Sequence, residues 1–148
     1  RDRDVTWLNN TALLDVSDLY GQDDIFILTS IDEAEKNLFQ SLKHQSTRLT
    51  DSEQEDGNPI VSPDGKKVVF TQGRGRLLTA EISDDGELSN EVILQDGWDT
   101  PSGIAWSPDS RWLAYSLSDL NFNEEVYIFR LFYKQADFLI GSFSNYRT

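Results

Sequence analysis

The chain is short, acidic and free of cysteine. It has 148 residues, 38% of them hydrophobic, and its 26 acidic residues outnumber 13 basic ones to give a net charge of -13. This charge argues against nucleic acid and anionic membranes as partners, because basic surfaces bind both. The lack of cysteine excludes disulfides and thiolate metal sites, and no apolar run reaches the roughly 18 residues of a membrane span. The composition therefore predicts one ordinary, rather polar globular domain.

Three segments of the chain repeat one pattern. They run over residues 5–17, 59–71 and 104–116, and their starts lie 54 and then 45 residues apart. Each has a large apolar residue seven positions before a second one, in the pairs Trp7 and Leu14, Val61 and Val68, and Trp106 and Leu113. A propeller blade takes about 40–50 residues, so the spacing predicts one blade per repeat. The three tryptophans Trp7, Trp106 and Trp112 lie at repeat positions and are expected in the core.

A turn divides each repeat. Ser-Pro-Asp-Gly at 62–65 suits a tight turn, because Pro presets φ, Asp bonds back to the backbone and Gly tolerates positive φ. Ser-Pro-Asp-Ser at 107–110 is the same turn with Ser in place of Gly. Leu-Asn-Asn-Thr at 8–11 is a degraded copy, with Asn as the residue that tolerates the left-handed conformation.

Runs rich in β-formers follow these turns in chain order. First strands are expected at 13–16, 68–71 and 112–116, second strands at 24–28, 76–82 and 125–130, and outer strands at 47–50, 92–94 and 136–140. The pattern predicts an all-β fold of about three four-stranded antiparallel β-propeller blades, at approximately 4–50, 57–95 and 101–148. Together they form a single partial, open propeller over 1–148. A generic β-sandwich of short strands is the alternative.

The segment 31–42 breaks the period. Ile31, Ala34, Leu38 and Leu42 fall near helical spacing, so the segment is either a short helix or a longer loop. It accounts for the greater length of the first repeat.

Three blades are too few to close a propeller ring. The sequence begins with Arg1 and contains no visible signal peptide, so a piece of a longer protein is one expectation. The other is a homo-oligomer in which copies pair through blade edges.

Several stretches resemble a known family. The stretches 62–70 (Ser-Pro-Asp-Gly-Lys-Lys-Val-Val-Phe), 106–116 and Arg48-Leu49-Thr50-Asp51 resemble repeats of TolB and tricorn propellers. The stretches 97–106 and 120–128 resemble more narrowly the propeller part of bacterial tricorn-type serine peptidases. In that family the propellers precede a PDZ module and a catalytic domain, and are thought to admit and sieve peptides. The resemblance covers roughly residues 4–130 and fits the tail from Leu131 poorly.

No complete catalytic site is visible. His44 is the single histidine, and it lies in a polar stretch without a nucleophile beside it, so we expect a solvated loop residue. Carboxylates cluster at 15–24, 51–56 and 81–87, but none matches a calcium loop, and no metal or cofactor is expected. Gly73-Arg74-Gly75-Arg76 is better explained as a hairpin turn than as a phosphate loop. Trp98, in a loop before a blade, is the one residue expected to contact a ligand or partner.

The resemblance implies a non-catalytic propeller segment of a serine peptidase that gates or binds peptide substrates. The alternative is a TolB-like periplasmic scaffold that binds a partner protein. Either function implies a peptide or protein partner and a bacterial location that is periplasmic or otherwise extracytoplasmic, with the cytoplasm as the other option. A free-standing enzyme is disfavoured because no nucleophile and base form a pair.

Overall fold

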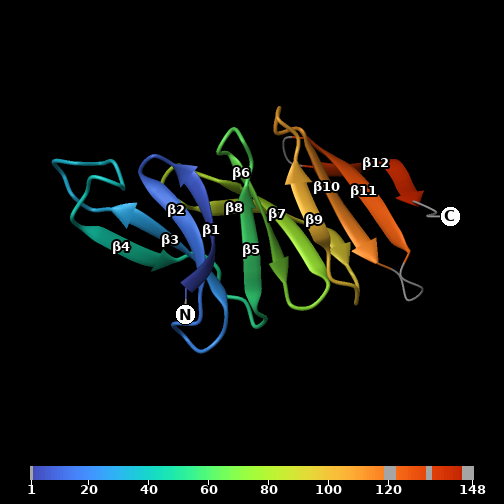
Figure 1. Ribbon diagram of the computed structural model, residues 1–148, viewed down its shortest axis with the longest axis horizontal. Coiled ribbons are helices and arrows are strands. Elements are labelled where there is room, and N and C mark those ends of the chain that lie inside the picture. The colour runs from blue at the N-terminus through green and yellow to red at the C-terminus, as the bar shows by residue number, and fades with distance from the viewer. Residues whose placement is uncertain (1, 119–122, 133–134, 145–148) are drawn as a thin grey trace.

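The described part of the chain is built from strands alone. The computed structural model describes residues 2–118, 123–132 and 135–144. They form three antiparallel four-stranded sheets, each made of consecutive strands and arranged side by side (Figure 1). This confirms the expected open propeller of three four-stranded sheets. No helix long and apolar enough to cross a bilayer occurs within these residues.

The strand bounds follow the three repeats. Sheet 1 contains β1 (Asp2–Asn9), β2 (Ala12–Ser17), β3 (Asp24–Ser30) and β4 (His44–Arg48); sheet 2 contains β5 (Asp56–Val61), β6 (Lys67–Gln72), β7 (Arg76–Ile82) and β8 (Leu88–Asp96); sheet 3 contains β9 (Ser102–Trp106), β10 (Trp112–Ser118), β11 (Glu124–Phe132) and β12 (Gln135–Ser144). Each expected strand overlaps an observed one. Of the stretch 120–128 that carries part of the resemblance, residues 120–122 lie outside the described residues.

The Ser-Pro-Asp turns behave as their chemistry predicts. The Ser62 hydroxyl bonds to the Asp64 carboxylate at 2.6 Å, and Gly65 has φ +71°. In the equivalent turn Ser107 bonds to Asp109 at 2.6 Å, and Ser110 takes the glycine position with φ +59°. Ser110 also serves a second purpose, because its buried hydroxyl accepts a hydrogen bond from the Asp64 N–H at 2.9 Å. The substitution of Ser for Gly therefore links the turns of sheets 2 and 3.

The first turn is one residue shorter than the other two. Val61 pairs with Val68 and Trp106 with Leu113, but Trp7 pairs with Leu13. The expected equivalence of Leu14 with Val68 is therefore wrong by one residue, and Leu13 is the equivalent of Val68. Because side chains alternate between the two faces of a sheet, Leu14 points to the opposite face from the one expected. The expected left-handed Asn is also absent, because neither Asn9 nor Asn10 has positive φ; instead the Thr11 N–H donates to Asn9 Oδ1 at 2.8 Å.

Each inner strand carries a β-bulge at an equivalent residue. Positive φ values of 53°, 48° and 58° occur at Asp4, Asn58 and Gly103, each three residues before the repeat's large apolar residue. Irregular register accompanies each of them in the pairing of inner and second strands. Asp, Asn and Gly tolerate this conformation better than other residues. The bulges therefore mark the repeat independently of its turns.

Two apolar clusters join the three sheets. One contains Leu14, Val16 and Ile27 of sheet 1 with Phe70 and Ala80 of sheet 2. The other joins sheet 2 to sheet 3 through residues such as Val69, Leu77, Leu113 and Tyr115. Sheet 2 is thus covered on both faces, whereas sheets 1 and 3 each have one face that no described sheet covers.

Two names describe these faces. The leading face of a sheet points toward the sheet before it in the chain, or away from sheet 2 in the case of sheet 1, and the trailing face is the opposite one. On sheet 1 the leading face carries Trp7, Leu13, Phe26 and Leu28, which alternate with residues of the first cluster. On sheet 3 the trailing face carries Ala114, Ser116, Val126 and Ile128, which alternate with residues of the second cluster.

Trp7 is not a core residue. It remains 45% exposed because it lies on the leading face of sheet 1, where its ring contacts Phe39 at a centroid distance of 4.8 Å. Trp106, at the same repeat position, packs against the second cluster and donates its indole N–H to the Ile60 carbonyl of sheet 2 at 2.9 Å. Trp112 is only half-buried, on the trailing face of sheet 3, where Arg130 lies 5.6 Å from its ring centroid. Of the three tryptophans expected in the core, only Trp106 packs against it.

The insertion between β3 and β4 is a loop. Its local bonds join backbone N–H groups to side chains two residues earlier, such as Ala34 to Asp32 and Phe39 to Asn37. These contacts compete with helix formation. Leu38 is buried and its N–H bonds to the Asn10 carbonyl at 3.0 Å, whereas Ile31 and Leu42 are exposed. The helical alternative is therefore wrong.

Candidate functional site

Trp98 lies at the rim of a hollow at one end of sheet 2. It follows β8 in the connection to β9, and its side chain is 83% exposed. The hollow has a volume of about 420 Å³ and is lined by Gln54, Gln72–Arg76 and Asp96–Trp98. We call this surface the Trp98 hollow. It brings together the hairpin between β6 and β7 and two connections between neighbouring sheets.

Two glycines let the hairpin and the Trp98 connection approach closely. A Cβ on Gly75 would lie 2.0 Å from the Gly97 carbonyl oxygen, so no other residue fits there without a shift. The Gly97 N–H donates to the Gly75 carbonyl at 3.3 Å, and the Thr100 hydroxyl donates to the Arg74 carbonyl at 3.0 Å. The Gly-Arg-Gly-Arg stretch is thus the expected hairpin, and it positions Trp98.

Arginine side chains give the hollow a basic component in an acidic protein. The Arg76 guanidinium pairs with Asp96 at 3.3 Å and donates to Gln72 Oε1 at 3.0 Å. Arg74 is exposed beside it. An exposed indole next to guanidinium groups can contact an apolar side chain and a carboxylate of the same ligand.

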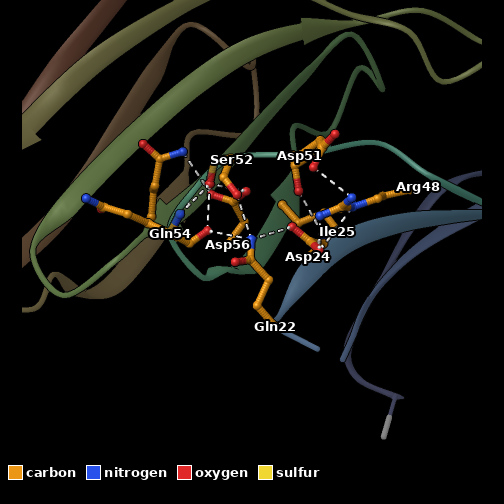
Figure 2. Close-up of polar contacts among 10 residues, drawn as sticks. Gln22, Asp24, Ile25, Arg48, Asp51, Ser52, Gln54 and Asp56 are labelled. Carbon is orange, nitrogen blue, oxygen red and sulfur yellow. Dashed lines mark hydrogen bonds and ion pairs between the residues drawn. The ribbon is translucent and has the colours of Figure 1, made fainter. Parts of the chain in front are cut away.

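The floor of the hollow connects to a buried carboxylate. Gln72 Nε2 donates to Asp56 Oδ1 at 3.0 Å. The Ser52 hydroxyl donates to Asp56 Oδ2 at 3.0 Å (Figure 2). Asp56 is 1% exposed. Burial raises its pKa above the ordinary value against the opposing effect of these hydrogen bonds, and the nearby Asp24 carboxylate adds to the rise.

A second buried carboxylate completes the network. Asp24 is fully buried at the start of β3, and Arg48 donates to its Oδ2 through Nη2 at 2.7 Å and Nε at 3.1 Å. Arg48 also pairs with Asp51 at 2.7 Å. Gln22 Nε2 donates to the Ser52 carbonyl at 2.6 Å and to Asp24 at 3.3 Å (Figure 2). The network therefore joins sheet 1, the connection 49–55 and sheet 2 beside the Trp98 hollow.

The other candidate residues do not form a site. His44 begins β4 rather than lying in a loop; it is exposed, and its Nε2 lies 3.1 Å from the Leu38 carbonyl. Among the described residues, no group of three or more His, Asp or Glu side chains is arranged to hold a metal ion. The structure instead brings Asp24 and Asp56 from two of the sequence clusters into one hydrogen-bonded network.

The buried network is the feature that sequence reasoning missed. Its members are separated by up to 50 residues, from Gln22 to Gln72, so no local motif contains them. One signal was present, because Arg48 and Asp51 stand in the Arg-Leu-Thr-Asp stretch.

The stacked four-stranded sheets and their repeated turns, with the Trp98 hollow at one end of sheet 2, define the class of protein as an open β-propeller. No protein-family model matches the chain. A 56-residue segment, 38% of this chain, is 41% identical to tricorn protease homolog 1 of Streptomyces coelicolor and covers 5% of it.

Solved structures show the same fold. The crystal structure of the tricorn protease matches with a TM-score of 0.65 and 13% identity, over 92% of this chain and 12% of the other. A puromycin-hydrolyzing peptidase of Mycobacterium tuberculosis matches with a TM-score of 0.67 and 14% identity, over 95% and 22%. An uncharacterized protein of Listeria monocytogenes EGD-e matches with a TM-score of 0.59 and 12% identity, over 92% and 39%.

These similarities confirm the predicted resemblance to the propeller region of tricorn-type peptidases. The chain spans 5% of the curated relative and 12%, 22% and 39% of the three structures.

Proposed function

We propose that this chain is a non-catalytic propeller segment of a tricorn-type serine peptidase, and that it binds peptides at the Trp98 hollow. The observation that carries the peptide-binding part is the position of Trp98. Its indole is 83% exposed at the rim of a hollow of about 420 Å³, where it is held by a glycine-dependent contact between two loops. Exposed large aromatics that a rigid scaffold holds in place are common anchors of recognition surfaces.

The chemistry of the hollow suits an extended peptide. Backbone amides of a peptide can bond to the exposed amide side chain of Gln54, which lines the hollow. Trp98 provides an apolar platform for a side chain, and Arg74 provides a cation. A propeller end with such a surface would retain peptides near a catalytic domain located elsewhere in the polypeptide. A periplasmic or other extracytoplasmic location belongs to the same proposal.

Peptide binding can be measured directly on this chain. The probe is a set of fluorescein-labelled decapeptides with randomised internal positions, and the readout is fluorescence anisotropy. We expect saturable binding that Trp98→Ala weakens at least about tenfold, because anchoring aromatics typically contribute 2 kcal/mol or more. Trp7→Ala is the matched control, because it removes an exposed indole far from the hollow.

Two results would contradict the proposal. One is the absence of saturable binding at millimolar protein. The other is equal weakening by Trp98→Ala and Trp7→Ala, which would place the contact outside the hollow.

A further inference from the structure

A row of polar side chains crosses sheet 2 at the end that holds the Trp98 hollow. The row consists of four cross-strand partners, one from each strand in chain order: Asp56, Gln72, Arg76 and Asp96. Residues directly opposite each other on neighbouring strands project from the same face of a sheet, so these side chains can contact one another in sequence. We call them the sheet 2 row. All of them line the hollow except Asp56, which is buried beside it.

Each member of the row is hydrogen-bonded to the next. Gln72 Nε2 donates to Asp56 Oδ1 at 3.0 Å, and Gln72 Oε1 accepts from Arg76 Nη1 at 3.0 Å. Arg76 donates in turn through Nε and Nη2 to the two carboxylate oxygens of Asp96, at 3.4 and 3.3 Å. The Gln72 amide satisfies both neighbours in one orientation only, because its nitrogen donates and its oxygen accepts. The carboxylate of Asp56 therefore fixes which atom of Gln72 faces Arg76.

The inner end of the row is held from the connection that precedes it. The second carboxylate oxygen of Asp56 accepts from the Ser52 hydroxyl at 3.0 Å (Figure 2). The same connection holds the hairpin beside the hollow, because the Gly73 N–H donates to the Glu55 carbonyl at 2.7 Å. A buried carboxylate is costly unless hydrogen bonds satisfy it, so these contacts hold the Asp56 side chain in one position.

The outer end of the row leads directly to Trp98. Asp96 is the last residue of β8, and Gly97 and Trp98 follow it. The Trp98 side chain is largely exposed, so it has little packing of its own to hold it in place. The position of the indole therefore depends on the contacts that hold the start of its loop, and the pair of Arg76 with Asp96 is one of them.

A blade of this kind folds without such a row. Leu117 of sheet 3 occupies the repeat position of Gln72, because each lies four residues after the second large apolar residue of its repeat. Leu117 is buried in the second cluster, and its cross-strand partner is Glu125. Buried polar groups often stabilise a fold no more than apolar packing does. The row in sheet 2 is therefore better explained by a role besides stability.

We propose that Asp56 and Gln72 are positioning residues of the Trp98 hollow. They hold the pair of Arg76 and Asp96, and through it the loop that carries Trp98, in the geometry that receives a ligand. The inference rests on the proposed function in one respect, because the ligand is taken to be a peptide. A loop that is ordered before binding loses less conformational entropy when the ligand arrives. Interruption of the row should therefore weaken peptide binding about 3- to 10-fold.

The experiment is fluorine NMR of the chain labelled with fluorotryptophan, in which Trp98→Phe assigns the Trp98 signal. Gln72→Leu interrupts the row with the residue that sheet 3 has at the same repeat position. It should move the Trp98 signal toward that of free fluorotryptophan and narrow it, because the indole becomes more mobile. Asp56→Asn keeps an acceptor oxygen for Gln72, so its Trp98 signal should match that of the wild type. The fluorescein-labelled decapeptides measure the affinity of each variant.

Gln22→Leu is the matched control. Gln22 is half-buried like Gln72 and donates to the Ser52 carbonyl at 2.6 Å, but it lies outside the row. Its replacement should leave the Trp98 signal and the peptide affinity unchanged. Gln72→Met, which has nearly the shape of glutamine without its hydrogen bonds, provides a second interruption of the row. Circular dichroism checks that each variant retains its fold.

The signal and the affinity distinguish the possible failures. An unchanged Trp98 signal in Gln72→Leu and Gln72→Met overturns the positioning role, whether or not peptides bind. An equal shift in Gln22→Leu also overturns it, because the buried network as a whole would then support the loop. A shifted signal with unchanged peptide affinity overturns the link between the row and binding. The absence of binding by the wild type contradicts the proposed function alone, since the signal of the free protein still tests the positioning role.

Discussion

Trp7 and Trp106 occupy the same position of the repeat, three residues after a left-handed residue in an inner strand. The Trp106 indole packs against sheet 2 and donates a hydrogen bond to Ile60, whereas Trp7 lies on an open sheet face and is 45% exposed. The strands around them are alike, so the difference comes from the neighbouring sheet. In a stacked array the repeat determines where a side chain points, and the adjacent unit determines how much that side chain stabilises the fold.

The largest expected difference between the two regions concerns leucines at equivalent positions. Leu113→Ala should cost about 2–5 kcal/mol of unfolding free energy, because Leu113 is fully buried in the second cluster. Leu13→Ala should cost about 1 kcal/mol or less, because Leu13 is only half-buried on the leading face of sheet 1. Urea unfolding of dilute protein measures both. Equal losses would show that the leading face is already covered.

The junction between sheets 1 and 2 contains the buried carboxylate of Asp56, whereas the junction between sheets 2 and 3 is joined by the apolar second cluster. Asp56→Ala should cost about 2–3 kcal/mol, because it leaves the donors of Ser52 and Gln72 without an acceptor. Asp56→Asn keeps the shape and one acceptor oxygen, so its cost should stay under about 1 kcal/mol. Thermal unfolding of the two variants separates them. A mild effect of Asp56→Ala would mean that water replaces the carboxylate in this network.

The turns offer a reciprocal exchange. Gly65→Ser should cost about 1–2 kcal/mol, because φ is +71° and a Cβ would lie 3.2 Å from the Leu8 carbonyl oxygen. Ser110→Gly relieves a positive φ but removes the hydroxyl that accepts from the Asp64 N–H, so its net change should be about 0.5 kcal/mol or less. Chemical denaturation measures the change in unfolding free energy for both variants. If the Ser110 hydroxyl contributes nothing, Ser110→Gly should stabilise the protein by about as much as Gly65→Ser destabilises it.

Replacing each repeat tryptophan by phenylalanine isolates a single hydrogen bond. Trp106→Phe removes the donor to the Ile60 carbonyl and should cost about 1 kcal/mol beyond the lost ring area. Trp7→Phe keeps an aromatic contact with Phe39 and should change stability very little. The difference between the two melting temperatures is the measurement, and a larger loss for Trp7→Phe would reverse the comparison.

The smallest effect is a pH dependence at Asp56. Burial raises the pKa of this carboxyl in the folded state, so the folded protein holds the proton more tightly than the unfolded chain does. Its contribution is then fully present below the unfolded pKa of about 3.9 and is lost as the pH rises through the folded pKa. The stability of Asp56→Asn relative to the wild type should therefore increase as the pH is raised from 4. A constant difference in urea titrations at several pH values would contradict this.

The strands and turns could be predicted because their causes are local. Ser-Pro-Asp-Gly and its Ser110 variant contain the residues that the turn requires, and the runs after them have the composition of strands. Trp98 could be recognised as exposed because it lies between a strand and the next repeat. The left-handed residues Asp4, Asn58 and Gly103 share the 54- and 45-residue spacing of the repeats. Because Asp, Asn and Gly tolerate positive φ, this spacing alone could have predicted the three β-bulges.

The remaining features depend on contacts that no short segment contains. The shift from Leu14 to Leu13 results from a turn one residue shorter, which only the strand pairing reveals. The environment of Trp7 depends on which sheet lies beside it. Asp24 and Asp56 belong to different sequence clusters and meet only after sheets 1 and 2 have packed.

The arrangement of each sheet from consecutive strands has a kinetic consequence. Hairpins of neighbouring strands close short loops, so each sheet can form at little cost in loop entropy. During synthesis at about 5–20 residues per second, sheet 1 is complete several seconds before β7 of sheet 2 leaves the ribosome. Throughout that interval the face of sheet 1 that carries Leu14 and Val16 is not covered by the complete sheet 2, and the nascent chain is most open to chaperones and to misassembly.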